Sequence, residues 1–154
     1  MPLSPKLEFF RNIFSKFVSE KTTIYMIRNI LAVIAGLLIG NIAIMGLHYL
    51  AMVFYPLPDV VDMNDMKAIA EYIRIAPLGS LLFVMLAHIG GTFMAGISTS
   101  LISKNIIPIY IIGVFFTLTG IYNLYMLPHP LWFNIEVFFY FPAAIYGHKL
   151  ISKQ

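Results

Sequence analysis

The sequence predicts an all-α, polytopic membrane protein with four transmembrane helices and an N-terminal amphipathic helix at the membrane surface. Of the 154 residues, 60% are hydrophobic and 11% are charged, whereas soluble domains contain roughly 45 to 50% apolar residues. The apolar residues gather in four runs, each close to the roughly 20 residues that a helix needs to cross a bilayer. We therefore expect the chain to lie in a lipid bilayer.

The first 25 residues combine apolar and basic side chains at helical spacing. Phe10, Phe14 and Phe17 recur every three or four residues, Lys6 precedes them and Arg11 lies among them. This pattern is typical of an amphipathic helix on an anionic membrane surface, whereas a cleavable signal peptide needs a continuous apolar region. Residues 1–25 are expected to form a cytoplasmic interfacial helix, with a helix packed on a partner subunit as the alternative.

Residues 26–154 are expected to form the transmembrane domain. Its spans should cover about residues 27–54, 77–102, 107–127 and 131–151. Pro56 ends the first span because proline blocks helix continuation. Pro108 is tolerated in the first turn of the third span, where no intrahelical donor is lost, and Pro142 predicts a kink in the fourth.

A short helix is expected in the loop between the first two spans. Asp62 and Asp65 have the spacing of an N-cap and the third residue of a capping box. Met66, Ile69 and Ile73 form an apolar stripe at helical spacing. The loop should therefore contain an interfacial helix that begins after Asp62.

The basic residues predict the orientation of the spans. Eight Lys and Arg residues fall on the side of the two termini, and only Lys67 and Arg74 fall on the opposite side. Cytoplasmic loops are enriched in Lys and Arg. The expected location is the bacterial inner membrane, with both termini in the cytoplasm.

Several classes of chemistry are excluded or unsupported. The chain has no cysteine, which excludes disulfides, zinc–thiolate sites and iron–sulfur clusters. Its basic residues form no patch interleaved with stacking aromatics, so nucleic acid is not an expected partner. No phosphate loop, nucleophile elbow or dinucleotide fingerprint is present, and we therefore predict no cofactor and no catalytic residue.

Three stretches, residues 30–41, 86–92 and 126–133, carry a resemblance to a known group of proteins. The second contains Leu-Ala-His-Ile-Gly and the third contains Leu-Pro-His-Pro-Leu-Trp. Together they resemble a family of small four-span bacterial inner-membrane proteins without an assigned function. The resemblance covers about Arg28 to Lys149, implies the same topology, and transfers no catalytic residue.

Small residues recur every four positions in the first two spans. The two stripes consist of Ala32, Gly36 and Gly40 in the first span and Ala87, Gly91 and Ala95 in the second. In lipid, helices associate through close van der Waals contact, and small residues let two backbones approach. We expect these stripes to pack against helices, either of the same chain or of a second protomer.

Polar residues within the spans predict a shared cavity. The candidates for this cavity are Asn41, His48, His88, Thr92, Asn123 and Glu136, with Asn134 at a similar depth. Polar groups in a bilayer need partners or water. Since these residues fall in the middle and outer parts of their spans, we expect a polar cavity that opens outward.

Glu136 is the only acidic residue in the expected spans, and three interpretations of it remain open. In the first, it lies in the first turn of the fourth span and reaches water near a helix N-terminus. In the second, it pairs with His48 or His88. In the third, it has a catalytic or proton-carrying role. Two histidines and this carboxylate would also suit a metal ion. Because no paired spacing such as HExxH places two ligands on one helix face, no metal site is predicted.

The leading functional hypothesis is an accessory or scaffolding subunit of a membrane complex, since the small-residue stripes and the basic N-terminal segment provide surfaces for a partner subunit or a homo-oligomer. The alternative is a small oligomeric transporter or channel that uses the outward-facing polar cavity. A membrane enzyme acting on a lipid-soluble substrate, with His88 and Glu136 as acid and base, is the third hypothesis.

Overall fold

The computed structural model describes residues 5–59, 61–62 and 64–152, and within residues 5–17 it describes the side chains of residues 8, 9, 13 and 16 only. The side chains of Lys6, Phe10, Arg11, Phe14 and Phe17, on which the interfacial helix was expected to depend, lie outside this description. The elements are α1 (Pro5–Phe54), α2 (Met66–Ile75), α3 (Leu78–Ile102), α4 (Ile106–Met126), the 3₁₀ helix η1 (Leu131–Glu136) and α5 (Val137–Ser152). No strand occurs among the described residues, so the all-α prediction is confirmed for them.

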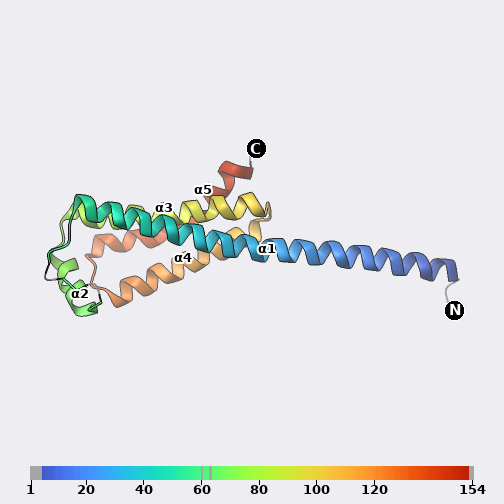
Figure 1. The fold of residues 1–154 in the computed structure, drawn as a ribbon, viewed down its shortest axis with the longest axis horizontal. Helices are drawn as coiled ribbons and strands as arrows, with labels where there is room; N and C mark the ends of the chain where they lie inside the picture. The colour runs from blue at the N-terminus through green and yellow to red at the C-terminus, as the bar shows by residue number, and fades with distance from the viewer. Residues whose placement is uncertain (1–4, 60, 63, 153–154) are drawn as a thin grey trace.

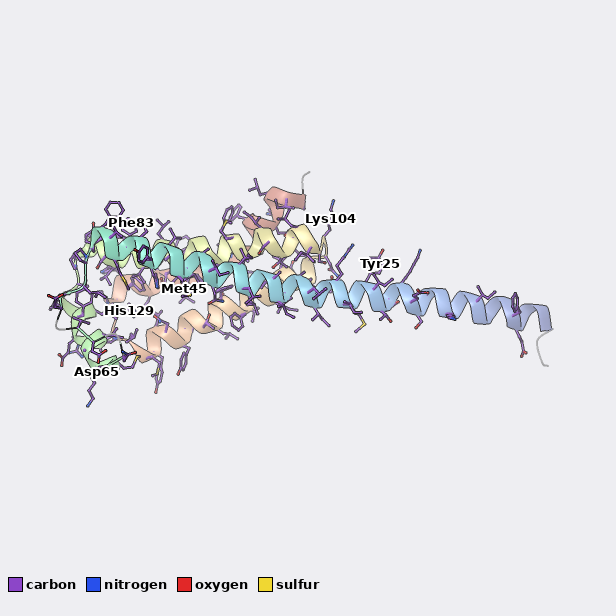
Figure 2. The ribbon with its side chains drawn as sticks, in the orientation of Figure 1. Tyr25, Met45, Asp65, Phe83, Lys104 and His129 are labelled. Carbon is purple, nitrogen blue, oxygen red and sulfur yellow. The ribbon has the colours of Figure 1, made fainter. Side chains whose placement is uncertain are left out.

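Helices α1, α3, α4 and α5 run lengthwise through the molecule, and α2 lies at one end of the bundle (Figure 1). Helix α3 packs against both α1 and α5, and α4 packs mainly against α5. Successive long helices run in opposite directions. Short connections join α3 to α4 and α4 to η1, whereas the longer segment that contains α2 joins α1 to α3. Figure 2 shows Asp65 and His129 at the α2 end and Lys104 near the opposite end.

Three helices of the described chain are long and apolar enough to cross a membrane. They lie within α1 at Val18–Phe54, in α3 and in α4. Their bounds agree with the first three expected spans to within one or two residues at the ends that face the loops. Membrane embedding is therefore compatible with the fold, and Pro108 lies in the first turn of α4 as expected.

The segment expected as a fourth span is divided between two kinds of helix. Its first six residues form η1 and only the next 16 form α5, which contains Pro142. Helix α5 alone is therefore shorter than the roughly 20 residues of a typical span. Phe133 and Tyr140 turn into the bundle and are buried, so η1 and α5 both contribute to the core.

The sequence predicted a break near residue 25, between an interfacial helix and the first span, but α1 has no break there. It continues without a break for 50 residues. The physical reason lies in the sequence: residues 6–35 contain neither glycine nor proline, so nothing interrupts the backbone hydrogen bonds. The N-terminal half of α1 projects beyond the other helices, past the end where Asn29 accepts a 2.6 Å hydrogen bond from Ser103 of α3.

The expected loop helix forms as α2, but its N-cap is Asp65 and not Asp62. The Asp65 side chain accepts a 2.8 Å hydrogen bond from the Lys67 backbone N–H. Asp62 instead accepts a hydrogen bond from the backbone N–H of Asn64, in the turn before the helix. Both contacts are local Asp-to-backbone bonds, and the spacing alone did not distinguish the cap from the turn.

Glycine on α1 and α3 allows the two backbones to approach closely. A Cβ placed on Gly40 would lie 2.8 Å from the Ala95 Cβ and 3.1 Å from the Gly91 carbonyl oxygen. A Cβ on Gly91 would lie 2.8 Å from the Gly40 carbonyl oxygen. Ala32, Ala87 and Ala95 are fully buried, so all six residues of the two stripes lie within the bundle.

A second close approach joins α3 to α5 and was not anticipated. A Cβ on Gly96 would lie 2.9 Å from the Ala144 Cα, and a Cβ on Gly147 would lie 2.9 Å from the Ile97 backbone nitrogen. Gly96 follows directly after Ala95, on the next face of α3. Helix α3 therefore carries two small-residue faces, one for α1 and one for α5.

Candidate functional site

Two neighbouring cavities lie inside the bundle. The loop-end cavity, of about 210 Å³, is partly open and is lined by the end of α1, by α2, by the start of α3 and by the end of α4. The mid-bundle cavity, of about 250 Å³, is also partly open and is lined by α1, α3, α4 and α5. Because His88 and Asn123 line both cavities, these two side chains mark the boundary between them.

The loop-end cavity has a mostly apolar lining. Its apolar side chains include Ala51, Met52, Ile69, Ile73 and Val84, and further lining residues come from the loop after α1. The polar side chains are those of His48, Tyr55, Tyr72, Ser80, His88, Asn123 and His129. None of its described lining residues is Asp, Glu, Lys or Arg.

Glu136 is fully buried and lies against His88. Its Oε2 is 3.3 Å from His88 Nδ1, and this contact joins the end of η1 to the middle of α3. The structure therefore agrees with the pairing interpretation of Glu136 and differs from the water-exposed one, because η1 turns its last residue into the bundle. A carboxyl and an imidazole that share one proton are neutral as a pair, which lowers the cost of burying them.

Tyr140 completes this cluster. Its hydroxyl lies 3.2 Å from the same His88 Nδ1, and Tyr140 is 2% exposed. One ring nitrogen carries either a proton or a lone pair, so Glu136 and Tyr140 compete for a single strong hydrogen bond. Tyr140 was not among the candidates from the sequence, although its position four residues after Glu136, about one helical turn on, was the signal that would have placed it on the same face.

His48 lies next to the cluster but does not contact Glu136. Its ring centroid is 5.2 Å from that of His88, at an interplanar angle of 56°. Four buried polar side-chain atoms have no hydrogen-bond partner among the described residues. Thr99 Oγ1 faces Gly36, away from this cluster, and the other three are His48 Nε2, Asn123 Oδ1 and Glu136 Oε1. Since buried polar atoms are usually satisfied, these three mark the part of the site with unused hydrogen-bonding capacity.

The other expected cavity residues satisfy their polar groups within their own helices. Thr92 is fully buried and donates a 2.8 Å hydrogen bond to the His88 carbonyl oxygen. Asn41 donates through Nδ2 to the Leu37 carbonyl oxygen at 2.8 Å. Both line the mid-bundle cavity, whereas Asn134 is exposed and belongs to neither cavity.

His129 reaches the loop-end cavity from the connection between α4 and η1. Its ring stacks on Phe133 with centroids 4.5 Å apart, and its Nδ1 lies 3.1 Å from the Leu127 carbonyl oxygen. Burial lowers the pKa of His129 below 6.5, and this outweighs the hydrogen bond to Leu127, which raises it. We therefore expect a neutral His129 beside the cavity at neutral pH.

A second buried histidine lies at the opposite end of the bundle. Ser100 donates a 2.7 Å hydrogen bond to the Gly96 carbonyl oxygen, and its Oγ is 2.9 Å from His148 Nδ1. Because the serine proton is used toward Gly96, His148 donates to Ser100. Sequence reasoning missed this pair, since neither residue type is unusual near the end of a span.

The arrangement can hold a small, mostly apolar molecule and offer polar atoms to one end of it. No group of three or more described His, Asp or Glu side chains could hold a metal ion. Comparisons with protein-family models, with curated proteins and with solved structures found no match to this chain.

Proposed function

We propose that this chain is a four-span protein of the bacterial inner membrane that binds a small lipid-soluble molecule in the loop-end cavity. The observation that carries the proposal is the cavity itself, in which an apolar lining leads to the polar side chains of His48, His88 and Asn123. Ligand sites are commonly concave and apolar, with a few polar groups that orient the ligand. Such a site would serve a transporter whose cavity faces outward.

The combined length of η1 and α5 supports a fourth span. Six residues of 3₁₀ helix and 16 of α-helix extend over roughly 36 Å. A hydrocarbon core is about 30 Å thick, so η1 and α5 together are long enough to cross it. The packing of α5 on α3 and α4 favours the same arrangement.

The distribution of Lys and Arg residues supports an orientation in which the loop-end cavity lies on the outer side of the membrane. Lys67 and Arg74 are the only Lys and Arg residues near the α2 end, whereas Lys104 and Lys149 lie toward the other end with the basic residues of α1. The positive-inside rule then places α2 and the loop-end cavity on the outer side. A lipid-soluble ligand would reach this cavity from the outer leaflet.

Photolabelling of the protein in lipid nanodiscs tests the proposal. The probe is a long-chain alcohol that carries a diazirine, and mass spectrometry locates the labelled residues. Binding predicts saturable labelling of cavity-lining positions such as Met52 and Ile69, which excess unlabelled alcohol suppresses. Uniform labelling of lipid-facing positions, unaffected by competitor, would contradict a binding site.

Two neighbouring substitutions provide a matched control. Ala76→Phe places a large ring in the cavity lining and should reduce the saturable labelling. Ile75→Phe, at a position that is 79% exposed and does not line the cavity, should leave it unchanged. Equal labelling in both variants would show that the probe binds elsewhere.

The projecting half of α1 favours a second candidate function, that of an accessory subunit. Ile13, Val18, Ile24 and Tyr25 are each about half exposed or more on this part of the helix, beyond the bundle. A partner membrane subunit or a second copy would cover such a surface. Native mass spectrometry of the purified protein tests this function, since a single chain without bound protein would contradict it.

A further inference from the structure

The chemical class of the ligand follows from the polar end of the loop-end cavity, provided that the proposed binding function is correct. His48 and Asn123 line this end, from α1 and α4 respectively. His48 Nε2 and Asn123 Oδ1 are both buried, and neither has a hydrogen-bond partner among the described residues. Both atoms therefore have unused hydrogen-bonding capacity, and a ligand that draws the two side chains toward the cavity would satisfy it.

The lining favours a ligand without charge. None of the described residues around the cavity is Asp, Glu, Lys or Arg, and the Glu136 carboxylate is not among them because it faces His88. Burying an ionised head group without a charged partner is costly. The cavity therefore selects against carboxylates, phosphates and ammonium groups.

The unpartnered atoms favour a ligand with a hydrogen-bond donor. Asn123 Oδ1 is an acceptor and needs an N–H or O–H group from a partner. His48 Nε2 donates or accepts, depending on which ring nitrogen carries the proton. A hydroxyl group suits both atoms, because it donates one hydrogen bond and accepts others.

We infer that the ligand of the loop-end cavity is a neutral amphiphile with a hydroxyl head group, which donates to Asn123 Oδ1 and hydrogen-bonds to His48 Nε2. Its apolar part lies along the α2 side of the cavity, near Ile69 and Ile73. The contact between Glu136 and His88 Nδ1 holds the His88 imidazole, which also lines this cavity. Phenols and alcohols with an alkyl chain belong to this class.

Two matched probes separate this inference from the proposed function. Para-octylphenol and its methyl ether, para-octylanisole, have the same alkyl chain, but only the phenol has a donor. Each is used to compete with the diazirine alcohol in nanodiscs, at equal mole fractions in the membrane. We expect the phenol to compete at a concentration about tenfold lower, the effect of one buried hydrogen bond.

Substitutions of Asn123 and His48 test whether these two side chains cause the preference for the phenol. Asn123→Leu removes the acceptor at similar volume and should abolish the preference for the phenol while the anisole still competes. His48→Phe should reduce the preference in the same way and gives an independent measurement if Asn123→Leu does not fold. Asn134→Leu, at an exposed position outside the cavity, should keep the tenfold preference.

Each outcome has a distinct meaning. Equal competition by the phenol and the anisole in the wild-type protein overturns the hydroxyl inference and leaves cavity binding in place. Failure of both probes to compete overturns the proposed function and the inference together. A tenfold preference that persists in both Asn123→Leu and His48→Phe shows that other groups recognise the hydroxyl, and it overturns the assignment.

Discussion

Gly96→Ala should destabilise the bundle, because the added methyl group meets the backbone of α5. The new Cβ would lie 2.9 Å from both the Cα and the carbonyl carbon of Ala144, and closer still to its carbonyl oxygen. Carbon atoms pack best at about 3.5 to 4.0 Å, so α3 and α5 must separate by roughly 0.6 to 1 Å. A backbone cannot rotate aside as a side chain can.

Gly46→Ala provides the matched control. A Cβ at Gly46 would meet nothing within 4 Å, so this substitution adds only the greater helix propensity of alanine, worth up to about 1 kcal/mol. Overpacking costs about 1 to 3 kcal/mol. We therefore expect Gly96→Ala to have a free energy of unfolding about 1 to 3 kcal/mol lower than that of Gly46→Ala.

Unfolding by sodium dodecyl sulfate in mixed micelles, followed by circular dichroism, measures this difference. Gly147→Ala should resemble Gly96→Ala, because its Cβ would lie 2.9 Å from the Ile97 backbone nitrogen on the opposite side of the same contact. Equal stability of Gly96→Ala and Gly46→Ala would refute the close packing of α3 on α5.

Three further predictions concern topology, the buried pair and pH. In cells that express single-cysteine variants, an impermeant maleimide should label a cysteine at Asp62 and not one at Lys104, and external labelling at Lys104 would reverse the proposed orientation. Glu136→Ala should destabilise the protein by about 3 kcal/mol because it removes the buried carboxyl that lies against His88 Nδ1 and leaves only the Tyr140 hydroxyl there; a double-mutant cycle with His88→Ala should show strong coupling, and additive effects would contradict a direct interaction. Because burial lowers the pKa of folded His129 below 6.5, the unfolded state binds more protons below that pH, so stability should fall as pH decreases from about 7 toward 5. The variant His129→Phe should lose part of this pH dependence, measured by the melting temperature, and an unchanged pH profile would show that His129 contributes nothing to it.

The hydrophobic runs were sufficient to predict the bounds of α3 and α4 and the end of α1. The expected second and third spans, 77–102 and 107–127, differ from α3 and α4 by at most one residue at each end. Proline and short polar loops set these boundaries locally, so no tertiary information was needed. The continuity of α1 was missed because a change from mixed to apolar composition was interpreted as a change of element, although no residue there breaks a helix.

The candidate site was harder to predict from the sequence than the helix bounds. Polar residues within apolar runs identified His48, His88, Asn123 and Glu136 as candidates, since such groups need partners in lipid. Which of them pair depends on helix rotation and on the 3₁₀ conformation of η1, which turns Glu136 inward. Neither property follows from hydrophobic periodicity, and the role of Tyr140 depends on both.

The unbroken backbone of α1 links the direction of its N-terminal part to that of the bundle. From Pro5 to Asn29 the helix extends for roughly 36 Å at 1.5 Å per residue. Inserting one residue in this stretch would lengthen it by about 1.5 Å and rotate everything before the insertion by about 100°. Binding of a partner that contacts both the projecting part and the bundle would therefore depend on this rotation. An insertion of four residues, close to one full turn, would be tolerated better than an insertion of two.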